Sequence, residues 1–353
     1  MNSRERMEMA LQFEALDRPP LSATFVPEIE EQLRARLGIK EKSLGIALGN
    51  DLVKSCAGLE RSFYGAPAPE YIDAWGIRWR YKKNAFGSFT EIIEHPLAGD
   101  KNKLAMYRIP DPKEDSQYED FMDLKARYGQ EKWMVGSSQI SIFEACWYLR
   151  GFESFLLDMA LDPDFCHALM DRVMEFPRKA ARRYVDLGAD MVWFGDDVAM
   201  QQGMIFSLEM WRTFLKPRYA TLFSECKNRN PRIKIAYHSC GNCEAVIDDL
   251  IEIGLDVLNP IQPTAIDPFA LKKRYGKRLV LFGCLCVQHV LPHGTPDEVA
   301  SAAQRLQNEC GAGGGYILSP AHHIQADTPL ANIEAFYKTG LQQGPDAQGK
   351  GST

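Results

Sequence analysis

The clearest indication of the fold is the stretch Arg232-Ile-Lys-Ile-Ala-Tyr-His-Ser-Cys-Gly241. It begins as an apolar, strand-like run over residues 232–239 and ends in the polar residues His238, Ser239 and Cys240. Runs of the same kind recur along the chain, separated by segments with the 3.6-residue period of amphipathic helices. The other predicted strands cover residues 132–140, 189–197, 255–261, 278–284 and 314–319. Regular alternation of strands and helices predicts a parallel sheet.

Local signals mark where the predicted helices begin. Thr295-Pro-Asp-Glu298 combines an N-cap Thr, a proline in the first turn and a capping-box Glu. Ser207 and Asp267 are also of the residue types that cap helices, and a proline follows Asp267. These boundaries agree with the alternation of strands and helices.

The N-terminal part of the chain completes the sheet. A helix at the start is followed by a predicted first strand over residues 19–26, and two closing strands on this side bring the number to about eight. A closed (β/α)8 barrel, or TIM barrel, is therefore preferred over an open doubly wound sheet, which usually carries a Gly-rich phosphate loop after a strand. The Gly-rich residues 311–315 precede a strand, and they predict a tight turn instead.

Residues from about 60 to 100 alternate aromatic side chains with glycine breaks, which indicates β-hairpin material inserted before the barrel resumes. The chain of 353 residues falls within the usual size range of a single barrel. We therefore expect one TIM-barrel domain over residues 1–340, with an N-terminal helical and β-hairpin extension. Residues 341–353 are expected to form a disordered tail.

Composition narrows the function. The net charge of −6 argues against a nucleic-acid-binding protein, because such proteins need a basic surface to displace counterions from phosphates. The sequence has no apolar run long enough to span a membrane, and its charged start does not read as a signal peptide. We expect a cytoplasmic protein whose nine cysteines are reduced thiols. The oligomeric state is left open, with a homodimer among the options.

The ends of the predicted strands are unusually polar. In barrels of this type, reactive groups gather at the carboxyl ends of the strands. His238 and Cys240 are two residues apart, so on an extended segment both side chains point toward a common centre. Imidazole and thiolate are good zinc ligands, and a catalytic zinc site needs three protein ligands and one open position. His322 is the favoured third ligand and Cys284 the alternative.

Two other interpretations of this segment remain. His238 and Cys240 could be core residues that are hydrogen-bonded without a metal. Cys240-Gly-Asn-Cys243 could also be a Cys-x-x-Cys redox pair, although that motif normally follows the first strand of a small βαβ domain.

Carboxylates follow two other predicted strands. Strand alternation predicts that only one of Asp196 and Asp197 faces the barrel mouth, and Asp197 is favoured. Glu144 is expected to act with Asp197 as a catalytic residue. The remaining polar residues at strand ends are assigned to substrate binding, namely Gln262, Asp196 and His323. A helix-capping role for the two aspartates and a solvated Glu144 are the structural alternatives.

Several short motifs together indicate a family. They are Arg4-Glu-Arg6 with Asp17-Arg-Pro-Pro20, Phe143-Glu-Ala145 with Leu149-Arg-Gly151, Gly195-Asp-Asp197, His238-Ser-Cys-Gly241, Phe282-Gly283, Gly294-Thr-Pro-Asp-Glu298, and Gly314-Gly-Tyr316 with Thr328-Pro-Leu-Ala-Asn332. With them, nearly the whole chain resembles the uroporphyrinogen decarboxylase superfamily. Within it, the resemblance is to the cobalamin-dependent branch that includes methylcobamide:coenzyme M methyltransferases.

The resemblance implies a barrel in which a His-x-Cys pair and a late Cys bind zinc. It also implies methyl transfer to or from a corrinoid, which a separate protein would carry because this sequence shows no cobalamin-binding domain of its own. Where that branch has its late Cys, this chain has Ser319-Pro-Ala-His-His-Ile-Gln325, which suggests that His322 replaces the thiolate. A His2Cys site carries less negative charge than a HisCys2 site, so its zinc would be a stronger Lewis acid. That favours a small methyl donor such as a methyl ether.

Three alternatives remain. The first is a methylcobamide:thiol methyltransferase. The second is a decarboxylase acting on a tetrapyrrole, which is disfavoured because Phe25-Val-Pro-Glu-Ile-Glu-Glu31 is acidic where the decarboxylase carries arginines for its substrate's carboxylates. The third is a non-catalytic barrel that binds a metal or a ligand without turning it over.

Overall fold

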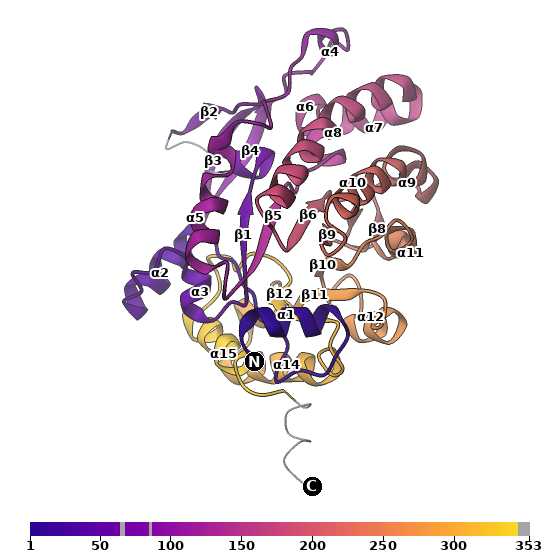
Figure 1. Cartoon of the computed structure of the whole chain (residues 1–353). Helices are drawn as coiled ribbons and strands as arrows, with labels where there is room; N and C mark the ends of the chain where they lie inside the picture. Colours follow the sequence, from indigo (N-terminus) through magenta and orange to yellow (C-terminus); the bar gives the residue numbers. More distant parts are fainter. Residues whose placement is uncertain (64–67, 85–86, 345–353) are drawn as a thin grey trace.

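Seven parallel strands form the central sheet of the protein, which curls around an apolar interior (Figure 1). The computed structural model describes residues 1–63, 68–84 and 87–344. In sheet order the strands are β1 (Leu52–Cys56), β5 (Trp133–Ser137), β6 (Met191–Gly195), β9 (Lys234–His238), β10 (Val257–Ile261), β11 (Val280–Leu285) and β12 (Tyr316–Pro320). Six of the seven match predicted strands, and their parallel pairing confirms the helix-strand alternation.

The eighth position of the barrel differs from the prediction. Where a full strand was expected over residues 19–26, the structure has two isolated bridges, from Leu21 to Leu318 and from Phe25 to Ile324. Pro19 and Pro20 lack the N–H groups that a ladder needs, so this segment pairs only in places. In the described part of the chain, one backbone hydrogen bond joins it to the β1 side, from Asp51 N to Leu21 O at 2.8 Å. We call the gap between residues 21–25 and β1 the seam.

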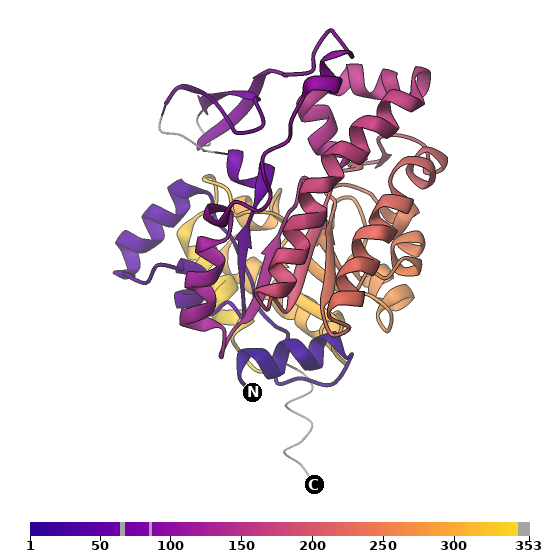
Figure 2. The ribbon, with the colours of Figure 1, turned by 45° about the horizontal axis from the view of Figure 1, so that its top comes forward.

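The inside of the curled sheet is filled by side chains. Alternate residues of the strands point inward, as period-two alternation requires, and they form one buried cluster. Met7 and Leu11 of α1 (Ser3–Leu11) join this cluster, so α1 closes the floor of the barrel at the amino-terminal ends of the strands (Figures 1 and 2). The strand residues in the cluster are Leu52, Trp133, Val135, Met191, Trp193, Ala236, Val257, Val280, Phe282 and Ile317.

Helices surround the outer face of the sheet (Figure 2). They include α5 (Glu119–Tyr128), α8 (Pro163–Asp186), α10 (Lys216–Arg229), α11 (Ile247–Glu252), α12 (Pro268–Tyr275), α14 (Pro296–Glu309) and α15 (Leu330–Gly340). Shorter or peripheral helices are α2 (Pro27–Leu37), α3 (Leu44–Leu48), α4 (Lys103–Met106), α6 (Phe143–Arg150), α7 (Phe152–Leu161), α9 (Leu208–Phe214) and α13 (Val290–His293). Three 3-10 turns are η1 (Gly58–Ser62), η2 (Asp115–Gln117) and η3 (Glu244–Val246). None of the helices in the described ranges is long and apolar enough to cross a membrane.

The predicted helix starts are confirmed. The Thr295 side chain accepts from Glu298 N, and the Glu298 carboxylate accepts from Thr295 N at 2.7 Å, which completes a capping box. Ser207 accepts from Met210 N at 3.1 Å and Asp267 from Phe269 N at 2.9 Å. Each cap satisfies a backbone donor that the first helical turn leaves free.

A three-stranded antiparallel sheet occupies the region where inserted hairpin material was predicted. Its strands are β2 (Glu70–Ile72), β3 (Arg78–Asn84) and β4 (Gly87–Glu94). It lies beyond the carboxyl end of β1 (Figures 1 and 2). A small two-stranded ribbon, β7 (Ala199–Met200) and β8 (Gly203–Met204), follows β6. Of the predicted tail, residues 345–353 lie outside the described residues.

Strand β11 contains an irregularity that matters for the site. Val280 and Phe282 point into the barrel, but Gly283 and Cys284 have positive φ angles of 124° and 78°. The register with β10 shifts at the same place, between Leu258 and Ile261. This bulge reverses the alternation, so Cys284 packs in the cluster on the helix side of the sheet.

Candidate metal centre

Three possible metal ligands meet at the carboxyl ends of β6 and β9. Asp197 follows β6, His238 is the last residue of β9, and Cys240 lies two residues further. One ligand atom from each lies within 4.8 Å of the other two. His238 Nε2 is 3.5 Å from Cys240 Sγ and 3.5 Å from Asp197 Oδ1. Carboxylate, imidazole and thiolate are all ligands that zinc accepts, so the donor set suits a zinc ion.

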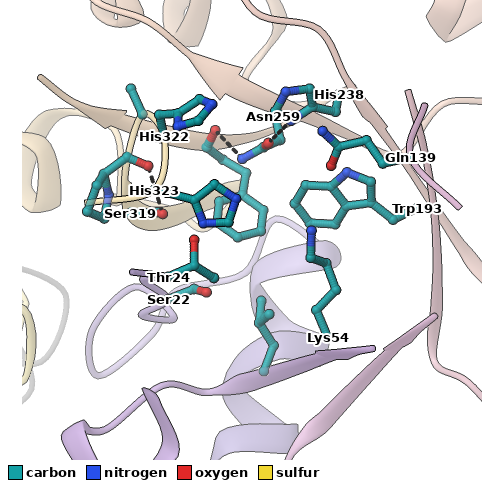
Figure 3. A pocket seen from close by; sticks show the side chains of 14 residues that line it. Ser22, Thr24, Lys54, Gln139, Trp193, His238, Asn259, Ser319, His322 and His323 are labelled. Carbon is teal, nitrogen blue, oxygen red and sulfur yellow. Dashed lines mark hydrogen bonds between the residues drawn. The ribbon is translucent and has the colours of Figure 1, made fainter. Parts of the chain in front are cut away.

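Asn259 fixes the orientation of the His238 ring. The two residues face each other in the register of β9 and β10, and His238 Nδ1 is 2.7 Å from Asn259 Oδ1 (Figure 3). The Asn259 amide nitrogen donates to Phe282 O at 3.4 Å, so the amide oxygen is the group that faces the histidine. Nδ1 therefore carries the proton and Nε2 presents a lone pair to Asp197 and Cys240. Burial lowers the pKa of His238, which also favours the neutral ring that a metal requires.

The loop after β9 is held in place by hydrogen bonds to its backbone. Cys240 N donates to Asp197 Oδ1 at 2.8 Å, and Gly241 N donates to Gln262 Oε1 at 2.7 Å. Gly241 has a φ of +80°, and a Cβ there would lie 2.5 Å from Met200 O. Glycine is therefore required at this position, because β7 approaches the loop too closely for a side chain.

Gln262 was predicted to bind substrate, but its amide oxygen accepts the hydrogen bond from this loop. Its amide nitrogen is the group left for a ligand.

Glu144 and Asp196 lie behind the centre. Glu144 Oε2 accepts from Asp197 N at 3.0 Å, so Glu144 supports the backbone of Asp197. Burial, together with the charges of Asp197 and Asp196, raises the pKa of Glu144 well above its ordinary value.

The assignment of Asp196 to substrate binding has to be corrected. Its fully buried carboxylate accepts from the backbone N–H groups of Ile142, Phe143 and Glu144 at the start of α6, and from the Tyr219 hydroxyl. Asp196 is therefore a structural cap.

The two residues expected as third ligand lie elsewhere. His322 is absent from the group of mutually close ligand atoms, where Asp197 takes the third place. Cys284 is directed away by the bulge in β11 and packs on the helix side of the sheet. His322 lies in the segment after β12, which ends at Pro320, and it lines the same cavity as His238, so its role as third ligand stays a prediction.

The Cys-x-x-Cys interpretation fits the geometry poorly. In the structure Cys240 and Cys243 are free thiols. Cys243 is buried, with its thiol 4.0 Å from Ser239 O. Burial raises the pKa of Cys243 to about 12, whereas redox-active pairs depend on a lowered thiol pKa.

A cavity of about 80 Å³ adjoins the centre on the barrel side, with His238 and Asn259 in its wall (Figure 3). Trp193 and Phe282 supply apolar surface, while His322 and His323 line the opposite side. The His322 and His323 rings lie edge to face with centroids 5.2 Å apart. The predicted substrate-binding residue His323 is therefore at the cavity, as is His322.

Sequence reasoning missed a partly buried ion pair, of which Lys54 lines the same cavity. Lys54 Nζ lies 2.6 Å from Glu60 Oε1 and 5.1 Å from the centroid of the Trp193 ring. Ser137 Oγ donates to Glu60 Oε2 at 2.5 Å. A signal existed for Lys54, which interrupts the apolar run Leu52-Val-Lys-Ser-Cys56. Glu60 lies in the turn η1, and because charged residues are common in turns, nothing in the sequence singles it out.

The sequence model of the Uroporphyrinogen decarboxylase (URO-D) family matches residues 73–340, and the chain belongs to this family. The methylated-thiol--coenzyme M methyltransferase of Methanosarcina mazei is 24% identical over 196 residues, 56% of this chain and 50% of the relative. A uroporphyrinogen decarboxylase of Nostoc sp. is 24% identical over 192 residues, 54% of this chain and 51% of the relative. The chain thus matches about half the length of these curated relatives.

Similarity to a solved structure extends over nearly the whole chain. A methyltransferase from Methanosarcina mazei superposes with a TM-score of 0.71 at 20% sequence identity, covering 96% of this chain and 98% of that one. At this level of identity the likeness establishes a shared fold.

Proposed function

We propose that the protein is a zinc-dependent methyltransferase that moves a methyl group between a small methyl compound and a corrinoid carried by a separate protein. The observation that carries the proposal is the group Asp197, His238 and Cys240 at the carboxyl end of a URO-D barrel, beside a cavity. Relatives named as methyltransferases share the family and the fold.

The roles of the residues follow from their contacts. Asp197, His238 and Cys240 would hold zinc, which as a Lewis acid activates the heteroatom that carries or receives the methyl group. Asn259 keeps His238 Nε2 aimed at the metal position. Glu144 supports Asp197 through its backbone N–H, and His323 faces the substrate from the cavity wall.

With Asp197 as third ligand, the argument for the methyl donor changes. The carboxylate and the thiolate together carry two negative charges, as do the two thiolates of a HisCys2 site. The metal is then less electrophilic than in the expected His2Cys site. A carboxylate oxygen is nonetheless a harder ligand than a second thiolate, so we retain the methyl ether as the first candidate donor. Methylated thiols are the second candidate, supported by the neutralised metal and by the relative named for that substrate class.

A decarboxylase acting on a tetrapyrrole has less support. The wall of the cavity contains Lys54 but no arginine among the described residues that line it. A substrate with many carboxylates would need several cationic partners at this point.

Methyl transfer and zinc binding can be tested together. The full-length protein should contain about one zinc ion per chain, and it should convert cobalt(I) corrinoid to methyl-cobalt(III) with at least one donor from a panel of ethers, thioethers and amines. Visible absorbance follows the change in cobalt state. His238→Ala should abolish both zinc and activity.

His293→Ala is the matched control, because His293 is exposed at the end of α13, outside the metal group. Full zinc retention in His238→Ala would contradict the metal assignment. Zinc binding without turnover on any donor, with the cognate corrinoid protein present, would support a non-catalytic metal-binding barrel instead.

A further inference from the structure

Lys54, in the wall of the cavity beside the metal centre, is paired with Glu60, which lines the adjoining cavity, and the net charge of the pair is zero. Lys54 and Glu60 are both largely buried, with side-chain exposures of 17% and 14%. Their 2.6 Å contact joins β1 to the turn η1, and Ser137 holds the second carboxylate oxygen. A buried pair of this kind is costly to assemble and is stable only when both partners remain.

Lys54 keeps hydrogen-bonding capacity that the pair does not use. An ammonium group has three N–H donors, and among the described residues Glu60 is the one hydrogen-bond acceptor recorded for Lys54. The amino group points toward the ring of Trp193 inside the cavity (Figure 3). A ligand oxygen could therefore accept from Lys54. A ligand anion, in contrast, would approach the Glu60 carboxylate as well, so that repulsion would cancel much of the attraction.

The space around this pair continues beyond the barrel. A second cavity of about 370 Å³ shares five lining residues with the first: Ser22, Thr24, Leu52, Lys54 and His323. It passes the seam, where residues 21–25 and β1 lack a regular ladder, and it reaches the exposed residues Lys42 and Asp120. We call it the side cavity. These shared lining residues would let the two cavities form one path from the metal position past Lys54 to the surface.

We propose that this path binds the part of the substrate that does not react, and that this part is uncharged and offers an oxygen to Lys54. The heteroatom bearing the methyl group lies at the metal end, and the remainder of the molecule extends past Lys54 and His323 into the side cavity. Lys54 and Glu60 thus act as specificity-determining residues that select neutral over anionic substrates. The inference rests on the proposed function for the position of the reacting end, but not for the selection itself.

Equilibrium binding tests the selection without any methyl transfer. The probes are two pairs of similar size, 2-methoxyethanol against methoxyacetate and 2-(methylthio)ethanol against (methylthio)acetate. Calorimetry on the full-length, zinc-loaded protein, with no corrinoid protein present, should show the neutral member binding at least about tenfold more tightly in one pair or both.

Substitutions of the pair should change this selectivity in opposite ways. Glu60→Gln leaves Lys54 without its counter-charge, so the preference should shift by about tenfold or more toward the anion. Lys54→Met removes the donor and should weaken binding of the neutral probe by a similar factor, about tenfold. Ser137→Ala removes a hydrogen bond to Glu60 but no charge, and it should leave the preference for the neutral probe intact.

Two further variants distinguish a change in ligand selectivity from a general loss of folding. Lys54→Met combined with Glu60→Gln removes both charges, which a buried site tolerates better than one lone charge, and this double variant should bind both probes weakly. Glu309→Gln is the matched control, because it breaks the exposed Arg305–Glu309 pair on α14, away from the cavity. Its selectivity should equal that of the unmodified protein.

The side cavity has its own test. Thr24→Trp places a bulky ring where the two cavities meet, so it should weaken a longer neutral probe, 2-(2-methoxyethoxy)ethanol, more than it weakens 2-methoxyethanol. Equal effects on both probes would refute the path through the seam.

An unchanged neutral-to-anion ratio in Glu60→Gln would overturn the selection, even if methyl transfer were observed. Conversely, selective binding that depends on Lys54, in a protein without methyl transfer, would uphold this inference while the proposed function failed.

Discussion

One amide side chain determines which nitrogen of His238 faces the metal centre. Asn259 Oδ1 accepts a hydrogen bond from the Nδ1–H group of His238, so replacing Asn259 by Ala frees the ring to turn or to change tautomer. Loss of such supporting partners typically weakens metal binding by about 10–100-fold, and we expect that range for Asn259→Ala. Competition with a chromophoric zinc chelator measures it. An affinity equal to that of the unmodified protein would contradict the orienting role.

The identity of the third ligand is a second question about single residues. We expect Asp197→Ala to lose zinc far more readily than His322→Ala, because only Asp197 lies within 4.8 Å of both other ligand atoms. Dialysis against graded chelator concentrations, followed by metal analysis, compares the two variants. The reverse order would restore the ligand set predicted from the sequence, with His322 in place of Asp197.

At the scale of elements, the bulge in β11 depends on Gly283. Its φ of +124° suits glycine alone, and a Cβ would lie 3.0 Å from Ile261 N. We expect Gly283→Ala to lower the free energy of unfolding by about 1–3 kcal/mol, as for other residues forced into such conformations. Urea denaturation measures the change. Gly203→Ala is the control, since no atom lies within 4 Å of the Cβ position there, and it should stay within about 0.5 kcal/mol.

The same element shows where sequence patterns stop being informative. The strand over 278–284 was predicted nearly at its observed position, because a continuous apolar run defines a buried strand. Cys284 was a candidate ligand because it stands at the end of this predicted strand. Alternation fails at the bulge, and one glycine in a strand does not reveal which way the following side chain turns. Strand β9, which leads to His238 and Cys240, has no such bulge. The two side chains could therefore be predicted to point toward one centre.

Across the whole molecule, the buried carboxylate of Asp51 joins α1, at the floor of the barrel, to residues 18–21 beside the seam. Asp51 accepts from Arg6 of α1 at 2.8 Å, from Arg18 at 2.7 Å and from Leu21 N at 2.8 Å. Asp51→Ala leaves the buried Arg18 guanidinium without its carboxylate partner and removes one of the two carboxylates that pair with Arg6, so we expect a loss of about 3–5 kcal/mol in unfolding free energy. Asp186→Ala, which breaks an exposed pair with Arg229, should cost at most about 1 kcal/mol. Similar losses in both variants would argue against the role of the network.

Acid stability should report on the same region. Partial burial would raise the pKa of Asp17, but hydrogen bonds and charge from Arg6 outweigh it and bring the pKa from 3.8 to about 2. A folded-state pKa below the unfolded one means that the stabilisation is complete above about pH 4 and is lost as the pH falls toward about 2. The stability difference between the unmodified protein and Asp17→Asn should therefore shrink over this window. A difference that stays constant across the window would refute the linkage.

The fold was more predictable from sequence than the site. Alternating apolar strands and capped helices are local patterns, and they locate most of the barrel. The proximity of His238 and Cys240 follows from their spacing at the end of one strand. The position of Asp197 beside His238 and Cys240, the contact of Asn259 with His238 and the Lys54–Glu60 pair depend on how separate elements face one another, which no local pattern encodes. Residues 19–26 form only isolated bridges because Pro19 and Pro20 lack N–H groups, an effect that the otherwise apolar run does not reveal.

The seam also bears on the order in which two substrates combine with the protein. A small molecule that enters beside β1 does not need the carboxyl-end opening of the barrel, so a large partner could occupy that opening at the same time. A ternary complex would then form, and double-reciprocal rate plots at several partner concentrations would give intersecting lines. Parallel lines would instead indicate that the first product leaves before the second substrate binds, which requires the methyl group to stay on the enzyme in between.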